Sequence, residues 1–319
     1  MVTRLVAARS DMEVVAINDL ADIEMACYLL KYDSVHGHFG KSCEVLDGQT
    51  LLIAGERVAY VNEPDPKKLD FARYGADVVL ECTGLFLTTQ EVAHHIEKGV
   101  RHVIISAVAK DDTPTYVLGV NAHEYKGECI ISNGSCTTNC LAPIAKVIDE
   151  HFGIQKGLMT TIHSYTNGQN LLDGKHPGDI RRARAAAENI IPTTTHAAQG
   201  IYKVLPALKG KLHGQSVRVP VVDVSMMDLT LVLDRNSDAQ TLNDLLNKAS
   251  QNELNGIISV DYEKRVSSDL LGSPYSSIVA ADLTQVIGEN MLKVMAWYDN
   301  ECGYSNRLVE MARFIYQER

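Results

Sequence analysis

One cysteine of this chain stands where a reactive thiol is expected. The polar segment SNGSCTTN, residues 132–139, lies between a β-branched run and an apolar helical run. Ser135 is a natural N-cap residue, which places Cys136 in the first turn of the helix. Unpaired backbone N–H groups and the positive end of the helix dipole favour a thiolate at that position. We therefore predict a nucleophile with a lowered pKa at Cys136, although the alternative for any cysteine is a small buried hydrophobe.

A histidine at the end of the next strand is the expected base. A helix over residues 136–151 would be about 24 Å long at 1.5 Å per residue. A strand over residues 157–163 would return about 23 Å at 3.3 Å per residue. The strand then ends beside the start of the helix, and His163 is the residue at that end. We predict a pair of Cys136 and His163, the arrangement in which a base activates a thiol.

Two groups of arginines are candidate anion sites. Arg218 falls in the middle of a strand expected over residues 216–220, where a charge is costly unless it is paired or binds an anion. A buried structural salt bridge is the alternative for Arg218. Arg181, Arg182 and Arg184 precede an alanine-rich stretch and the threonine run at residues 193–195. Substrate binding and a solvated or subunit-contacting loop both fit this cluster.

The first 130 residues have the pattern of a doubly wound parallel α/β sheet, with helical stretches between short β-branched strands. The strands are expected over residues 13–18, 77–81, 103–106 and 129–132. Asp19 follows the first strand, where a dinucleotide-binding fold places the carboxylate that binds the adenosine ribose; an ordinary turn aspartate is the alternative. No two of the 22 glycines are two residues apart, so a G-x-G phosphate-binding turn is missing.

The second half has a different pattern, with longer alternating strands. They are expected over residues 157–163, 215–220, 224–234 and 292–297, before an amphipathic closing helix over residues 305–317. This half is predicted to be α+β with a mostly antiparallel sheet. We expect a nucleotide-binding domain over residues 1–135, completed by the helix of residues 301–319, and a catalytic domain over residues 136–300.

Composition excludes several functional classes. The 319 residues are 45% hydrophobic and 22% charged, which indicates a globular protein of about two domains. A net charge of −10 argues against binding to nucleic acid or to an anionic membrane surface. Arginines at Arg4 and Arg9 interrupt the position of a signal peptide, so we expect a cytoplasmic protein. Seven scattered cysteines without a CxxC pair predict reduced thiols and no metal site.

Six segments together resemble the phosphorylating glyceraldehyde-3-phosphate dehydrogenases. They are SNGSCTTNCLAPIAKV, TTIHSYTNGQN, RRARAAAENIIPTTT, VRVPVVDVS, VSSD and WYDNECGYSNR, in the order and spacing of that family. The resemblance implies a Rossmann domain with NAD and an NAD-dependent aldehyde dehydrogenase of glycolysis or gluconeogenesis. It implies that Cys136 attacks the aldehyde carbon of glyceraldehyde 3-phosphate while His163 takes the thiol proton. Hydride transfer to NAD would give a thioester, which inorganic phosphate would cleave to 1,3-bisphosphoglycerate.

The resemblance also implies the other site residues and the assembly. The phosphate of the substrate would bind Thr166 and Arg218. The attacking phosphate would bind Ser135, Thr137 and Thr195, with Arg182 nearby. The cofactor would contact Asp19, Thr83, Ser106, Asn300 and Tyr304, with Asn300 on the nicotinamide carboxamide. Asp19 favours NAD over NADP because a carboxylate repels a 2′-phosphate. A homotetramer is implied as well.

Several positions depart from the family pattern. Gly168 replaces an aspartate, Val108 a proline and Gly134 an alanine, while His196 and Gln199 replace a glycine and a lysine. An imidazole at His196 would either clash with phosphate or, if protonated, add a cationic donor. Two alternatives follow: an erythrose-4-phosphate dehydrogenase, which hydrolyses its thioester, and a catalytically impaired homologue acting as a binding protein. The Ser-Tyr-Thr after His163 and the threonine run fit the phosphorylating enzyme better.

The missing glycine turn predicts a gap in the first sheet. In a sheet of order 3-2-1-4-5-6 the first strand is central, and by the family pattern it would precede Met1. Without that strand two neighbours face a gap, and each unpaired buried backbone group costs about 1–3 kcal/mol. We therefore expect the natural protein to begin upstream, with a strand and a G-x-G-x-x-G turn that run into residues 2–8.

Overall fold

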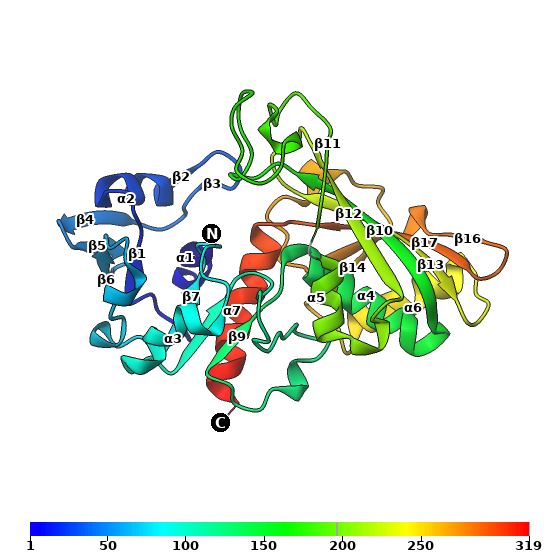
Figure 1. Cartoon of the computed structure of the whole chain (residues 1–319), viewed down its shortest axis with the longest axis horizontal. Coiled ribbons are helices and arrows are strands. Elements are labelled where there is room, and N and C mark those ends of the chain that lie inside the picture. The colour runs from blue at the N-terminus through cyan, green and yellow to red at the C-terminus, as the bar shows by residue number, and fades with distance from the viewer. Residues whose placement is uncertain (196, 319) are drawn as a thin grey trace. The chain divides into compact units, whose positions relative to one another are not determined.

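The computed structural model describes residues 1–195 and 197–318, and the chain divides into two compact units (Figure 1). Unit 1 comprises Met1–Thr115, Tyr125–Asn133 and Ser305–Arg319. Unit 2 comprises Tyr116–Glu124 and Gly134–Tyr304. The predicted pair Cys136 and His163 therefore lies wholly within unit 2.

Unit 1 contains two larger sheets and three helices of its own. In the first sheet β1 (Ala16–Asn18) pairs in parallel with β6 (Glu56–Val61), which continues antiparallel to β5 (Thr50–Ile53) and β4 (Cys43–Asp47). The second sheet is parallel and consists of β7 (Val78–Glu81), β8 (His102–Ile105) and β9 (Ile130–Ser132). The helices are α1 (Val2–Ala7), α2 (Ile23–Lys31) and α3 (Thr89–Glu97), and a short hairpin joins β2 (Tyr32–Asp33) to β3 (Gly37–His38).

The four strands predicted in this half are present as β1, β7, β8 and β9; β1 has half the expected length, β7 and β9 are one residue shorter, and β8 is shifted by one residue. The predicted α/β fold of this half is confirmed, with parallel pairings β1–β6, β7–β8 and β8–β9. The sequence analysis missed β4, β5 and β6, whose pairings with one another are antiparallel. Within the described residues, β1 and β7 each end a separate sheet and pair on one side only. The expectation that β1 and β7 face a gap left by an upstream strand stays a prediction.

Unit 2 is built on one eight-stranded sheet. Its order is β11-β12-β10-β13-β17-β15-β14, with β16 paired to β17. The strands are β10 (Ile154–Ser164), β11 (Ile191–Thr193), β12 (Leu212–Val219), β13 (Ser225–Leu233), β14 (Ile258–Asp261), β15 (Ser277–Ala280), β16 (Gln285–Ile287) and β17 (Met291–Tyr298). Among the described strands of this sheet, only β10–β12 and β14–β15 pair in parallel, so the prediction of a mostly antiparallel sheet is confirmed.

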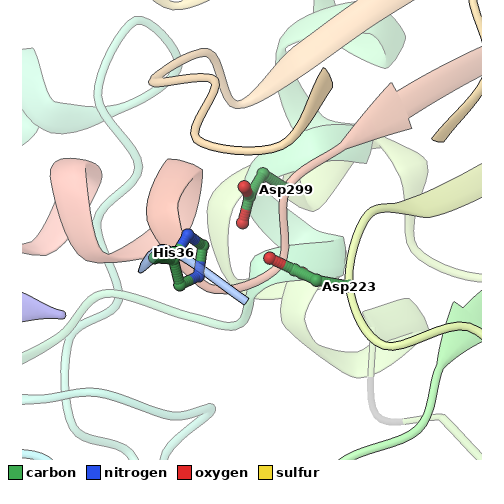
Figure 2. A group of neighbouring side chains, drawn as sticks. All are labelled: His36, Asp223 and Asp299. Atoms are coloured by element: carbon green, nitrogen blue, oxygen red, sulfur yellow. The ribbon is translucent and has the colours of Figure 1, made fainter. Parts of the chain in front are cut away.

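The closing helix α7 (Cys302–Gln317) follows β17 after a tight turn. Asp299 stabilises the start of α7, because its Oδ1 accepts hydrogen bonds from the backbone N–H groups of Glu301 and Cys302 (Figure 2). Leu308, Val309 and Met311 are buried, as the predicted amphipathic pattern requires. No helix among residues 1–195 and 197–318 has both the length and the apolar character to cross a bilayer.

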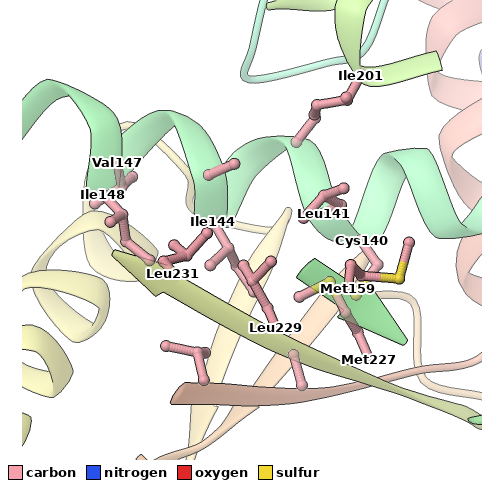
Figure 3. Packing of buried hydrophobic residues seen from close by; sticks show 14 of the residues in the cluster. Cys140, Leu141, Ile144, Val147, Ile148, Met159, Ile201, Met227, Leu229 and Leu231 are labelled. Carbon is pink, nitrogen blue, oxygen red and sulfur yellow. The ribbon is translucent and has the colours of Figure 1, made fainter. Parts of the chain in front are cut away.

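Helix α4 (Cys136–Phe152) fixes the geometry of unit 2, with α5 (Ala197–Val204) and α6 (Ala239–Gln251) as its neighbours. Its apolar side lies over the sheet, where Ile144 and Ile148 belong to the same buried cluster as Leu229 and Leu231 of β13 (Figure 3). Each fully buried aliphatic side chain contributes about 1.5–3 kcal/mol relative to exposure. Gly153 ends the helix with φ +70°, and β10 starts at once. The predicted helix and return strand are both confirmed.

Candidate active site

The structure brings Cys136 and His163 together. Ser135 caps α4, with its Oγ accepting a hydrogen bond from the backbone N–H of Thr138 at 3.1 Å, so Cys136 is the first residue of the helix. His163 is the penultimate residue of β10. The Sγ of Cys136 lies 3.6 Å from Nε2 of His163. This geometry lets the imidazole exchange a proton with the thiol.

The charge states of this pair differ from the expectation. Burial raises the pKa of the Cys136 thiol, although Thr137, the Arg218 charge and the backbone N–H groups of the helix start oppose that effect. Burial, with the positive charge of Arg218, lowers the pKa of His163 to about 3. The predicted fall in the thiol pKa is therefore wrong for this structure. The pair is a neutral thiol beside a neutral imidazole at neutral pH.

Arg218 lies beside His163 because β12 and β10 run in parallel with these two residues in register. Its Nη1 is 2.6 Å from Nδ1 of His163 and 2.8 Å from the carbonyl oxygen of Ser164. The same carbonyl lies 2.8 Å from Nδ1 of His163. Nδ1 cannot both accept from Arg218 and donate to Ser164, so the Arg218 contact selects the tautomer that carries its proton on Nε2.

Arg218 has the environment of an anion-binding group. Among residues 1–195 and 197–318, no carboxylate lies within ion-pair distance of its guanidinium. Its buried Nε also has no hydrogen-bond partner there. The salt-bridge alternative for Arg218 therefore finds no support in the described residues. A half-buried cation without a counterion favours an anionic ligand.

Arg182 adds a second positive charge near this pair. It lies in a 3₁₀ turn, Arg181–Ala183, and its Nε donates to Oγ1 of Thr193 at 2.9 Å. Asp179 accepts from the same threonine at 2.8 Å and holds it in place. The charge of Arg182 lowers the pKa of both His163 and Arg218, which shows that it acts on the same site. Arg181 and Arg184 are exposed instead.

The two phosphate-site threonines outside α4 are less tightly connected. Thr166 is exposed in the turn after β10, and Gly168 follows in the same turn. Oγ1 of Thr195 accepts a hydrogen bond from the backbone N–H of Ala197, at the start of α5. Neither threonine shares a hydrogen bond with Cys136, His163 or Arg218. His196 lies outside the described residues, as does the side chain of Gln199, so the predictions for these two positions stay predictions.

A buried tyrosine that the sequence analysis missed contacts both the start of α4 and the ring of His163. The hydroxyl of Tyr298, at the end of β17, lies 3.0 Å from Oγ1 of Thr137 and 2.6 Å from Oγ1 of Thr161. Its ring meets the ring of His163 edge to face, with centroids 5.9 Å apart. Burial raises the pKa of Tyr298 far above its usual value, so it stays a neutral phenol. The predicted strand over residues 292–297 stops one residue short of Tyr298, which continues the buried face of Leu292, Val294 and Ala296.

Three of the predicted cofactor residues lie at the carboxyl ends of parallel strands of unit 1. Asp19 follows β1, Thr83 follows β7 by two residues, and Ser106 follows β8. Ligands of open α/β sheets bind at these ends. One carboxylate oxygen of Asp19 accepts the N–H of Ala21, and the side chain is exposed, so the other oxygen can accept ribose hydroxyls. These donor and acceptor types fit the adenosine half of NAD.

The other two predicted cofactor residues lie in unit 2. Oδ1 of Asn300 accepts hydrogen bonds from the hydroxyls of Ser164 at 2.9 Å and Ser225 at 2.7 Å. These bonds fix the amide so that Nδ2 is the group left to donate, which suits a carboxamide oxygen. Tyr304 donates to the carbonyl of Gly134 at 2.9 Å. Sequence analysis missed Ser164 and Ser225 because only the fold brings them to Asn300.

Comparisons with known proteins match both halves of the chain to the same family. The family model "Glyceraldehyde 3-phosphate dehydrogenase, NAD binding domain" matches residues 1–89, and the model of the C-terminal domain matches residues 135–300. Glyceraldehyde-3-phosphate dehydrogenase of Priestia megaterium is 48% identical over 316 residues, 98% of this chain and 94% of the relative. The relative from Helicobacter pylori is 46% identical over an alignment of 324 positions, which covers 99% of this chain and 95% of the relative.

A plant relative is similar as well. Chloroplastic glyceraldehyde-3-phosphate dehydrogenase B of Pisum sativum is 48% identical over 310 residues, 96% of this chain and 68% of that protein. The family models include a domain that binds NAD, and the residues at the strand ends of unit 1 fit that cofactor. Together these matches show that the chain belongs to the glyceraldehyde-3-phosphate dehydrogenase family of NAD-dependent oxidoreductases.

Proposed function

We propose that this chain oxidises glyceraldehyde 3-phosphate with NAD and transfers the acyl group to inorganic phosphate, forming 1,3-bisphosphoglycerate in glycolysis or gluconeogenesis. The observation that carries the proposal is the distance of 3.6 Å between Sγ of Cys136 and Nε2 of His163, beside an arginine without a carboxylate partner in the described residues. Cys136 is the nucleophile, and His163 is the base.

The phosphate of the substrate binds first to the cationic side of the site. Arg218 is proposed to contact it directly, with Thr166 contributing a hydroxyl and Arg182 a second charge. A guanidinium binds a phosphate through two parallel hydrogen bonds, which also fixes the orientation of the ligand. The aldehyde carbon is then held within reach of Cys136, which converts an encounter into an intramolecular step.

Phosphate binding also prepares the base. The contact of Arg218 with Nδ1 selects the tautomer with a proton on Nε2, which cannot accept the thiol proton. When phosphate engages the guanidinium, Nδ1–H can donate to the carbonyl of Ser164, and Nε2 presents its lone pair to Sγ. Neutralising Arg218 also removes one of the causes that lower the pKa of His163. The imidazole is thus more basic when substrate is present.

The chemical steps follow from this arrangement. The thiol gives its proton to Nε2 of His163 as Sγ bonds to the aldehyde carbon. NAD, when bound, supplies the two-electron oxidation of this adduct to a thioester. Ser135, Thr137 and Thr195 are proposed to bind inorganic phosphate, whose oxygen attacks the thioester carbon and releases Cys136 as the leaving group. Protonated His163 returns a proton to the sulfur and closes the cycle.

Each unit has a proposed role. Residues 1–135 with the helix of residues 301–319 form the NAD-binding domain, and residues 136–300 form the catalytic domain. Asp19, Thr83, Ser106, Asn300 and Tyr304 would hold the cofactor. We also propose a cytoplasmic homotetramer, supported by the small residues of the alanine-rich segment after Arg184. Light scattering at micromolar concentration should give the mass of four chains.

An assay with and without inorganic phosphate tests the proposal. The reduction of NAD with glyceraldehyde 3-phosphate should depend on phosphate and form an acyl phosphate. Turnover of erythrose 4-phosphate without phosphate, with release of a free acid, would instead support the hydrolytic enzyme. An impaired binding protein would show neither reaction.

A further inference from the structure

A buried pair of carboxyl groups lies next to Asn300 in unit 2. Asp223 is in the loop between β12 and β13, and Asp299 is in the turn between β17 and α7; both are 1% exposed. One carboxylate oxygen of Asp223 lies within 4.8 Å of one carboxylate oxygen of Asp299, and Figure 2 shows the two side chains close together. A negative charge on Asp299 at this distance raises the pKa of Asp223.

The surrounding groups decide which carboxyl holds the proton. Asp299 accepts hydrogen bonds from three backbone N–H groups: Gly272 at 2.8 Å, Glu301 at 3.0 Å and Cys302 at 2.6 Å. These three donors fix the position of the Asp299 side chain. Burial, and then the charge of Asp299, raise the pKa of Asp223 to about 8. At neutral pH Asp223 is therefore the protonated partner, and its hydroxyl is available to donate to Asp299.

Other titratable groups strengthen this assignment. Glu301, in the same turn as Asp299, adds a negative charge that also raises the pKa of Asp223. Burial, together with both carboxylates, raises the pKa of the Cys302 thiol at the start of α7 to about 11, so that thiol stays neutral. His36, the third side chain in Figure 2, belongs to unit 1. Within unit 2 these groups all favour a proton on Asp223.

The same two segments are joined a second time through the cofactor amide. Ser225, two residues after Asp223, donates from its Oγ to Oδ1 of Asn300, the residue after Asp299. Between the two links lies Val224, which is 3% exposed and has φ +66°. A β-branched residue in this left-handed region is strained and persists only when its surroundings hold it. The bond from the Val224 N–H to Oδ1 of Asp223 is one such constraint.

We propose that Asp223 is a positioning residue: its protonated carboxyl, bonded to Asp299, holds the strained loop so that Ser225 keeps the amide of Asn300 in the orientation that NAD requires. Loss of the proton places two negative charges side by side in the protein interior. Their repulsion moves the loop of Asp223 away from the turn of Asp299, and the amide of Asn300 is then no longer held in place. NAD affinity then falls in alkaline solution. The inference rests on the proposed role of Asn300 in binding the cofactor.

Titration of NAD into the full-length protein tests this inference, with the dissociation constant measured by calorimetry from about pH 6.5 to about pH 9.5, on both sides of the transition. The variants are Asp223→Asn, whose amide still donates to Asp299 but cannot ionise, and Asp282→Asn, an exposed carboxyl of the same unit. The affinity of wild type and of Asp282→Asn for NAD should fall about tenfold over this range, because a difference of one unit between the pKa of Asp223 in the free and in the bound protein produces that change. The affinity of Asp223→Asn for NAD should change less than about twofold over the same range.

Two further measurements keep the result unambiguous. The pKa of Asp223 in the folded protein lies above its value in the unfolded chain. Wild type without cofactor therefore loses stability as the pH rises from the unfolded to the folded pKa. The Tm of Asp223→Asn should therefore exceed that of wild type above neutral pH. Equal Tm values, or equally steep NAD titrations, would overturn the proposal. If Asn300→Ala leaves NAD affinity unchanged, the assigned role of Asn300 fails, and the proton-sharing pair remains as a purely structural feature.

Discussion

Cys136 and Cys140 are one helical turn apart on α4, yet they differ in exposure and in the groups that their sulfur atoms contact. The Sγ of Cys136 is partly exposed and lies 3.6 Å from an imidazole nitrogen. The Sγ of Cys140 is fully buried in the apolar cluster and accepts a hydrogen bond from Oγ of Ser277 at 3.2 Å. Burial raises the pKa of Cys140 to about 12. One helix therefore carries a candidate nucleophile and a structural thiol.

The difference arises from what each turn of the helix faces. The first turn of α4 lies at the end of β10, where the side chains of His163, Thr137 and Tyr298 converge. The next turn lies over the middle of the sheet, where methionine and leucine side chains leave no polar partner except Ser277. Reactivity is thus set by the edge of the sheet rather than by the cysteine itself.

Replacement of Cys136 by alanine should have the largest effect. Without Sγ no covalent adduct forms, so turnover should fall below about a thousandth of wild type. Alanine is a good helix former, and the Ser135 cap is untouched, so the Tm should stay close to that of wild type. Steady-state kinetics and thermal unfolding measure the two effects separately. Retained dehydrogenase turnover would remove Cys136 from the mechanism and end the contrast with Cys140.

Loss of the base should have the next largest effect. His163→Asn should reduce the rate by about 10²–10⁴-fold, the usual contribution of a positioned general base. Because the pKa of wild-type His163 is about 3, its imidazole is neutral throughout the neutral range. Iodoacetamide labelling of Cys136 in wild type should therefore rise with the thiol ionisation alone, without a step near the ordinary histidine pKa. A clear step there would show that the pair is charged in solution.

Chain length and periodicity were enough to predict the placement of Cys136 and His163. The lengths of helix α4 and strand β10 bring their polar ends together in any compact arrangement, and Ser135 and Gly153 mark the helix limits. The hairpin of β5 and β6 was missed, although its two-residue turn has φ +54° at Ala54 and φ +93° at Gly55. Positive values at both positions are typical of a tight hairpin turn.

Contacts between distant segments could not be predicted in this way. Tyr298 is 161 residues from Thr137, and Ser225 is 75 residues from Asn300. The fall in the His163 pKa depends on burial and on Arg218, and neither has a local sequence signal. The expected fall in the Cys136 pKa failed for the same reason, because the helix dipole is visible in the sequence whereas desolvation is not.

Replacement of Cys140 by alanine should have the smallest effect on activity and a measurable effect on stability. The missing sulfur leaves a small cavity between α4 and the sheet, so the free energy of unfolding should fall by about 1–2 kcal/mol. Oγ of Ser277 would still donate to the carbonyl of residue 140, a bond of 2.6 Å that does not involve the sulfur, so no buried hydroxyl is left without a partner.

Urea unfolding and kcat/KM together check the prediction. A loss of kcat/KM comparable to that of Cys136→Ala, in a variant that still folds, would mean that Cys140 takes part in the chemistry despite its burial. Activity close to wild type with reduced stability is the result expected if the two turns of α4 divide catalysis and packing between them.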